Sequence, residues 1–333
     1  MGTRGWRLLT ANILVAALPL GLGLLLLASG APMTSPDVER LVASVREASL
    51  AETILWFLLI ALLAFLSQPL QRPLVRVLEG YWDGSAAGRA LGALGVRRHR
   101  RHLRRLIDIA YGQANGYRRT ALRRLARRRL TTDYPSQERL LPTRLGNALR
   151  AFEDEAGQRY GLDTITMLPR LYPYLSSQVS GALDDLRDQL DIAARLCVTL
   201  LLASLISASL LFTHGWWLLL PAATTVLAWV AYRSAVQAAV AYGKQVAVAF
   251  DLHRFDMLRG LHFPLLPADR EWQFNKQVSD FFLNRLSLSP DDPPDDYPDY
   301  QHPDELLILT PTPVEPADGA SAASRSSLLS PVT

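Results

Sequence analysis

Histidine and carboxylate side chains are the residues of this chain that could bind a metal or transfer a proton. His99 and His102 have the spacing of two ligands on one helix face, but the surrounding arginines would repel a cation. His253 lies close to Asp251 and Asp256 and could form an acid–base or metal group. Charges on a solvated helix give the same pattern far more often. We therefore predict no catalytic residue, no metal ligand and no cofactor.

Two acidic groups could act on cations. Residues 153–155 are adjacent acids, so on a helix they point about 100° apart and cannot all face one ion. Asp184, Asp188 and Asp191 share a helix face immediately before an apolar run. They could form an acidic mouth for cations, but pairing with the arginine block between residues 72 and 130 is favoured.

The motifs of common enzyme classes are missing from the sequence. No glycine-rich loop ends in the Lys-Ser/Thr pair that grips a nucleotide phosphate, and no HExxH or paired-cysteine zinc signature occurs. Cys197 is the single cysteine, which excludes a disulfide framework within one chain. These absences favour a protein that is not an enzyme.

Four apolar runs dominate the chain, at residues 8–29, 53–70, 196–213 and 216–232. Each is about long enough to cross a hydrocarbon layer of roughly 30 Å, and lipid requires such segments to be helical. The first run could instead be a signal peptide, but it is longer than a usual h-region, so we expect an uncleaved anchor. The predicted fold class is all-α: a polytopic membrane protein with four transmembrane helices and a helical cytosolic domain.

Arginine counts predict the orientation of these spans. Sixteen arginines lie between residues 72 and 130, against Glu79, Asp83 and Asp108, which gives this block a net charge of +13. Only Arg40 and Arg46 lie between the first two runs. Because basic loops stay inside, we expect the central region and both termini in the cytosol, at the bacterial plasma membrane.

The basic block has apolar residues at helical intervals, which predicts one or two amphipathic helices between residues 97 and 129. Such helices could lie on the anionic inner leaflet, and the alternative is a solvated positive-inside signal. Nucleic acid is not expected as a partner, because no binding fold or stacking aromatics accompany the charge. The arginines predicted to contact lipid are Arg97, Arg98, Arg100, Arg101, Arg104, Arg105, Arg118, Arg119, Arg123 and Arg124.

Gly80, Gly84, Gly88 and Gly92 recur every four residues just before the basic block. On one helix they would share a face and let another helix approach closely. Glycine also weakens helices, so a flexible connector is an equal alternative.

Helical patterns continue through the middle of the chain. Thr143 is a predicted N-cap for a helix from Arg144 to about Gly157, and Pro169 and Pro173 are expected to break the chain later. From residue 177 one helix should run into the third apolar run, and the fourth run should continue to residue 260. Both would extend beyond the bilayer and pack together as a coiled-coil-like stalk.

These patterns divide the chain into five parts. Residues 1–78 hold the first transmembrane pair, 79–192 a cytosolic helical domain, and 193–260 the second hairpin with its extensions. Residues 261–287 form a C-terminal helical segment. The acidic, proline-rich tail at 288–333 should be disordered, and it could fold back on the basic block or reach a protein partner.

Several strings resemble uncharacterised multi-pass membrane proteins of high-GC Gram-positive bacteria. They are LPTRLGN from Leu141, RYGLD from Arg159, LPRLYP from Leu168, AYG from Ala241 and AFDLHRF from Ala249. The resemblance covers residues 140–261 and implies a bacterial plasma membrane protein. It implies no activity and no catalytic residue.

The order of the apolar runs also resembles the layout of bestrophin-type channels, which are pentameric, although no motif matches theirs. We expect a non-enzymatic membrane scaffold or sensor with a cytosolic interaction domain. The alternatives are an oligomeric ion channel and a membrane-embedded enzyme. The expected partners are anionic membrane lipids, further copies of the chain, and a protein that binds the tail.

Overall fold

The computed structural model describes residues 17–112, 117–283 and 298, and in these ranges the chain is helical without strands. The predicted all-α class is therefore confirmed. Two helices of the described part are long and apolar enough, by length and composition, to cross a membrane, and they contain the third and fourth apolar runs. Residues 1–16 of the N-terminal segment and the predicted tail at 288–333, except Pro298, lie outside the described residues.

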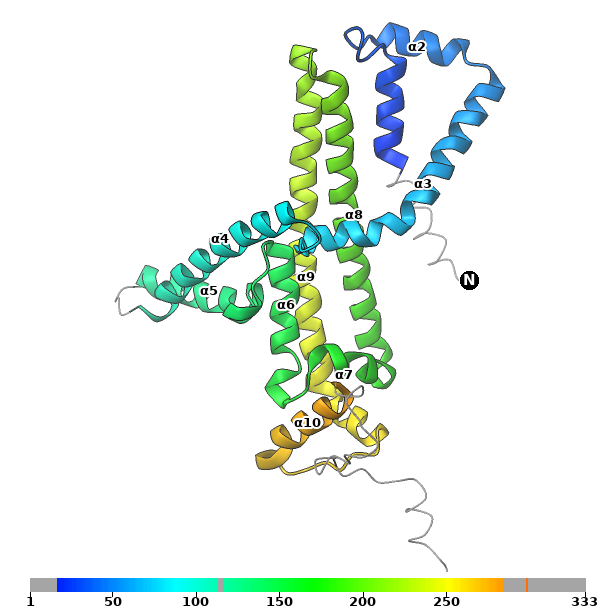
Figure 1. The fold of residues 1–333 in the computed structure, drawn as a ribbon. Helices are drawn as coiled ribbons and strands as arrows, with labels where there is room; N and C mark the ends of the chain where they lie inside the picture. Colours follow the sequence, from blue (N-terminus) through cyan, green and yellow to red (C-terminus); the bar gives the residue numbers. More distant parts are fainter. Residues whose placement is uncertain (1–16, 113–116, 284–297, 299–333) are drawn as a thin grey trace, which may run out of the picture.

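The helices α8 (Ser177–Leu211) and α9 (Leu219–Gly260) pack against each other and run the length of the molecule (Figure 1). Both are continuous, as predicted, and the 42 residues of α9 extend about 63 Å at 1.5 Å per residue. A 3₁₀ turn at Gly215–Leu218 joins them. The fourth run therefore enters its α-helix slightly later than predicted, because its two leading tryptophans belong to the turn.

The N-terminal segment lies beside one end of this pair. In the helix Ala17–Ala28, Leu26 packs with Ala31 and with Leu211 of α8 in a small apolar cluster. Helix α2 (Val38–Glu47) follows, and α3 (Leu50–Glu79) returns toward the middle of the molecule (Figure 1).

Helix α3 changes direction between its two ends (Figure 1). A capping box between Ser49 and Glu52 begins the helix. The second half of its sequence contains Pro69 and Pro73, and a proline has no N–H to give to a helical hydrogen bond. The end of α3 crosses to α6 and α8.

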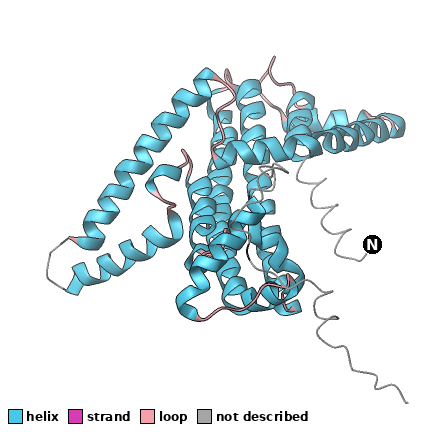
Figure 2. Ribbon diagram, turned by 60° about the horizontal axis from the view of Figure 1, so that its bottom comes forward, coloured by secondary structure: helices cyan, strands magenta, loops and turns pink. Residues whose placement is uncertain are grey.

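Helices α4 (Ala86–Tyr111) and α5 (Tyr117–Asp133) form a hairpin that projects sideways from α8 and α9 (Figures 1 and 2). Leu103, Leu106 and Ala110 of α4 are buried together with Ala126 of α5 and with Tyr134. The prediction of one or two helices in the basic block is confirmed.

Of the two alternatives for Gly80, Gly84, Gly88 and Gly92, the shared helix face is wrong, because the four glycines do not lie on one helix. Gly80 ends α3 in a left-handed conformation with φ of 101°, and Gly84 lies in the following turn. Gly88 and Gly92 belong to α4. The spacing of the glycines alone does not show that a helix ends at Gly80.

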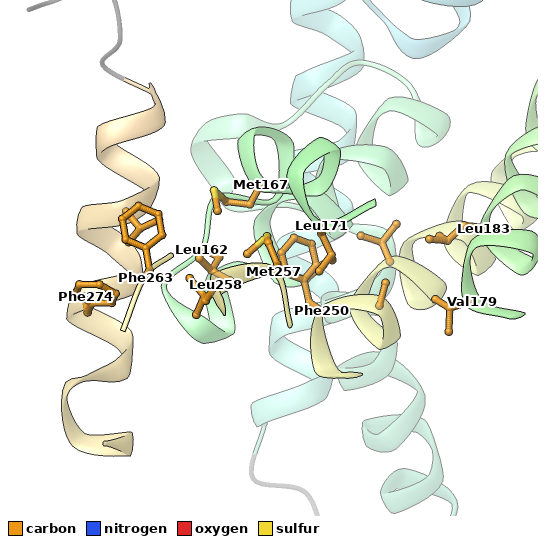
Figure 3. Close-up of a cluster of buried hydrophobic side chains, with 14 residues drawn as sticks. Leu162, Met167, Leu171, Val179, Leu183, Phe250, Met257, Leu258, Phe263 and Phe274 are labelled. Carbon is orange, nitrogen blue, oxygen red and sulfur yellow. The ribbon is translucent and has the colours of Figure 1, made fainter. Parts of the chain in front are cut away.

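Three more helices surround the lower half of α8 and α9. They are α6 (Arg144–Glu155), α7 (Thr164–Leu171) and α10 (Ala268–Leu283), with 3₁₀ turns at Gln137–Arg139, Gln158–Tyr160 and Tyr172–Tyr174. Thr143 caps α6 as predicted, by accepting a hydrogen bond from the backbone of Gly146. In the core of this half, Phe250 and Met257 of α9 lie against Met167 and Leu171 of α7 (Figure 3).

Pro169 does not break the chain as predicted, because it lies inside α7. Its missing N–H removes one bond to the carbonyl of Ile165 in a helix of only eight residues. Met167 and Leu171 are fully buried on either side of it, so packing holds the helix across the proline.

Candidate anion-binding site

An arginine-lined cleft of about 930 Å³ lies where α4 meets the N-terminus of α6 and the middle of α9. Seven of its lining side chains are guanidiniums, and four segments of the chain contribute them. The lining residues are Leu94, Arg97, Arg98, His99, Arg101, His102 and Arg105 of α4, Arg129 of α5, Tyr134, Arg144 of α6 and Arg233 of α9.

Helical periodicity in α4 places its arginines on the cleft. Positions 94, 98, 101 and 105 are three or four residues apart and so share one face. Leu103, Leu106 and Ala110 lie on a different face and are buried under α5. Burial of this apolar stripe therefore fixes the rotation of α4 and turns the basic face toward the cleft.

Tyr232 positions the remaining wall of the cleft. Its hydroxyl oxygen accepts hydrogen bonds from the backbone N–H groups of Arg144 at 3.1 Å and Leu145 at 3.2 Å. Thr143 donates a hydrogen bond of 2.7 Å to the carbonyl of Glu79. The start of α6 is thus tied both to α9 and to the end of α3.

Close backbone packing makes this junction rigid. A Cβ atom on Gly146 would lie 1.9 Å from the carbonyl oxygen of Glu79, so only glycine fits there. Gly80 and Gly95 approach the ring of Pro142 in the same way. Asn147 is fully buried and bonds through its side chain to the backbone of Leu141 and Thr143.

The charge of the cleft is almost uncompensated within the described residues. Arg144 pairs with Asp133 at 3.7 Å, and Arg233 stacks over the ring of Trp229 at 5.3 Å. No carboxylate lines the cleft, and the other five lining arginines form no ion pair with a described carboxylate. Convergent guanidiniums without acids are the chemistry of an anion site.

Neutral side chains complete the wall. His99 Nδ1 lies 3.2 Å from the hydroxyl oxygen of Tyr134. Burial, followed by the charges of His102, Arg98 and Arg144, lowers the pKa of His99 to about 4. Burial raises the pKa of Tyr134. At neutral pH both groups are therefore uncharged hydrogen-bonding partners beside the arginines.

The structure divides the arginines that the sequence singled out. Arg97, Arg98, Arg101 and Arg105 line the cleft, and the missed arginines 129, 144 and 233 join them from other elements. The exposed residues Arg100, Arg104 and Arg124 lie outside the lining, and Arg123 donates to the carbonyl of Gly112. The side chains of Arg118 and Arg119 lie outside the described residues.

The acidic and histidine groups do not form a second site. Asp184 accepts a hydrogen bond from the hydroxyl of Tyr172, and this bond raises the pKa of Tyr172 to about 12. No ion pair joins Asp184, Asp188 or Asp191 to a described arginine of α4 or α5. The pairing of Asp184, Asp188 and Asp191 with the arginine block is therefore not observed among the described side chains of α4 and α5. The described part of the chain holds no cluster of three potential metal ligands.

His253 contacts Asp256 at 3.2 Å, whereas the carboxylate of Asp251 accepts from Tyr160. Arg254 pairs with Glu271 at 3.0 Å and lies over the ring of Tyr160 at 4.1 Å. These contacts join α9 to α10 and to the turn before α7, so the AFDLHRF string has a packing role.

The cleft offers donors and positive charge to an anion, and its lining contains no cysteine, serine, threonine or carboxylate. In comparisons with known proteins, no family model, no curated protein and no solved structure matches this chain.

Proposed function

We propose that this chain is a four-span plasma membrane protein, with both termini in the cytosol, that acts as a non-enzymatic scaffold or sensor. Its cytosolic helices engage the anionic inner leaflet through the arginines of α4 and α5. The resemblance to multi-pass proteins of high-GC Gram-positive bacteria is consistent with this location.

One observation carries the proposal: the basic cleft begins at the level where the apolar surface of α9 ends. Residues 196–232 contain no Asp, Glu, Lys or Arg, and Arg233 is the next residue. Outward-facing side chains of this stretch are large and apolar, with Leu205 68% and Val226 59% exposed. Such a surface suits lipid, and the arginines beside its end suit lipid headgroups.

The direction of the α4–α5 hairpin is consistent with a membrane surface at the position of Arg233 along α9. The α4–α5 hairpin projects sideways from α8 and α9, as a helix pair lying along a membrane surface would (Figure 1). Each basic residue near an anionic surface contributes about 1 kcal/mol before screening.

Packing of the N-terminal helix supports an uncleaved first span. A Cβ atom on Gly23 would lie 3.1 Å from Ile206, and Leu26 contacts the Leu211 cluster of α8. The apolar helices Ala17–Ala28 and Leu50–Leu62 are shorter than α8 and α9, and we propose them as parts of the first two spans.

Site-directed labelling tests the orientation. In a Cys197→Ser background, we expect Thr213→Cys in the α8–α9 turn to react with a membrane-impermeant maleimide on intact cells. Arg100→Cys should react only after permeabilisation. Reaction of Arg100→Cys in intact cells would contradict the proposal.

Reconstitution tests the role. The scaffold or sensor proposal expects no ion flux above that of empty liposomes when the full chain is inserted into phosphatidylglycerol-containing liposomes. Flux that depends on the protein would instead favour the oligomeric channel.

A further inference from the structure

We propose that the arginine-lined cleft is a specific site for a phosphate-bearing anion, such as a phosphomonoester or diphosphate group. The inference rests on the proposed function, because it assigns the lipid contact to one built site rather than to a diffuse charged surface. The phosphate could belong to a lipid headgroup or to a soluble compound.

The convergence of charge is the first argument. Arginines on one solvated helix can diverge, but here α4, α5, α6 and α9 direct seven of them to a single cleft. Only Arg144 has a described carboxylate partner, at 3.7 Å. Like charges held together in this way repel one another, and a bound anion would relieve that repulsion.

The second argument is size and shape. The cleft volume of about 930 Å³ falls within the range of roughly 300 to 1,000 Å³ that is usual for small-molecule sites. This volume exceeds the needs of a single chloride or sulfate ion. A headgroup or compound with one or more phosphates fits it better.

The third argument is donor chemistry. The planar guanidinium fork binds two phosphate oxygens at once, which a lysine cannot do. His99 and Tyr134, which contact each other at 3.2 Å, add neutral hydrogen-bonding groups to the wall. A phosphate with several oxygens can use both kinds of partner.

Position decides how a lipid would reach the site. Arg233 follows the apolar stretch of α9 directly, and Trp229, 59% exposed, lies one turn earlier. A lipid could keep its chains against this apolar surface while its headgroup phosphate enters the cleft. A soluble phosphate would enter from the cytosolic side.

The main experiment compares two triple variants of the full chain in neutral detergent. The variant Arg97→Gln/Arg98→Gln/Arg101→Gln removes charge from the cleft, and Arg100→Gln/Arg104→Gln/Arg124→Gln removes the same charge from exposed positions outside it. Native mass spectrometry measures binding of short-chain phosphatidic acid against phosphatidylcholine. Calorimetry measures binding of inorganic pyrophosphate.

We expect the cleft triple variant to weaken phosphatidic acid or pyrophosphate binding at least about tenfold, and the outside variant less than about twofold. Binding of the lipid alone identifies a headgroup as the source, and binding of pyrophosphate with the same dependence identifies a soluble phosphate. Equal weakening by both variants would overturn the site while leaving diffuse lipid contact intact. If the protein binds neither phosphatidic acid nor pyrophosphate, the proposed site is overturned as well.

A measurement on the wild-type chain guards against misfolding of the variants. Pyrophosphate or phosphatidic acid should slow phenylglyoxal modification of Arg98 and Arg101 and leave Arg100 and Arg104 unchanged. Protection of all four arginines to the same degree would count against the cleft. The maleimide experiment tests membrane orientation independently, so failure of either proposal can be recognised separately.

Discussion

The two halves of the α8–α9 pair solve the same packing problem in opposite ways. In the lower half, Phe250, Met257 and Leu171 are fully buried among helices that surround the pair (Figure 3). In the upper half, small residues such as Ala203 and Ala228 fill the contact between the helices, while large apolar side chains face outward.

This difference teaches which solvent each half requires. Large exposed apolar patches are costly in water and are uncommon on soluble monomers. The lower half buries its central apolar residues, such as Phe250 and Met257, through protein contacts. The upper half leaves them outside, so only lipid or another protein can cover them.

The largest expected effect comes from the buried half. Phe250→Ala should lower the free energy of unfolding by about 3–5 kcal/mol, because it leaves a cavity in the core of the lower half. Leu205→Ala, in the exposed half, should change it by less than about 1 kcal/mol. The midpoint of thermal unfolding in detergent measures both. A larger loss from Leu205→Ala would break the comparison.

An arginine introduced at an exposed position of α9 tests whether lipid or water surrounds that position. Leu227 and Leu252 are 54% and 59% exposed on the same helix, so they form a matched pair. Leu227→Arg should disfavour membrane insertion by about 3 kcal/mol, whereas Leu252→Arg should have little effect. The yield of folded protein in the membrane fraction is the measurement, and equal yields would place both positions in water.

Acidification should destabilise the fold around His99 of α4. The pKa of His99 is lowered to about 4 in the folded chain, under the influence of burial, His102, Arg98 and Arg144, while the unfolded value is 6.5. The unfolded state therefore binds its proton first as pH falls from about 7 to 4, and stability should decrease by about 1–3 kcal/mol.

The unfolding midpoint across this pH range measures the effect of His99. His99→Gln should flatten the dependence, and Tyr134 should keep its position in that variant because glutamine can still bond to its hydroxyl. A variant with the same slope as wild type would show that other groups control the response.

The smallest expected effect comes from the contact between Tyr232 of α9 and the start of α6. Tyr232→Phe removes the acceptor of the Arg144 and Leu145 N–H groups and should cost about 1 kcal/mol of stability. Tyr111→Phe, at a tyrosine that is 69% exposed, is the control and should cost almost nothing. Equal unfolding midpoints for the two variants would show that the Tyr232 hydroxyl does not stabilise the start of α6.

Local patterns predicted the helices well where a single helix carries the signal. The N-cap at Thr143 and the continuity of α8 and α9 follow from short-range capping and from uninterrupted apolar spacing. The alternative of a shared helix face for the four glycines at residues 80–92 was wrong, because a glycine in such a spacing can also end a helix. The predicted break at Pro169 was wrong, because the burial of Met167 and Leu171 outweighs the loss of one helical hydrogen bond.

The candidate site was half predictable for a similar reason. Arg97, Arg98, Arg101 and Arg105 stood out because they cluster in sequence. Arg233 did not, since more than a hundred residues separate it from α4 and its local surroundings are those of any residue at the end of an apolar run. Only the crossing of α4, α6 and α9 brings these arginines together.

The sequence by itself determined the helical class, the charge-free stretch at 196–232 and the surplus of arginine beside it, because these depend on composition and on the helical period alone. The tertiary structure decided which arginines line one cleft and which lie outside it. That choice depends on the rotation of α4, which burial of Leu103, Leu106 and Ala110 fixes, and on the Tyr232 contact that holds α6 against α9. Both are long-range contacts, which no local pattern encodes.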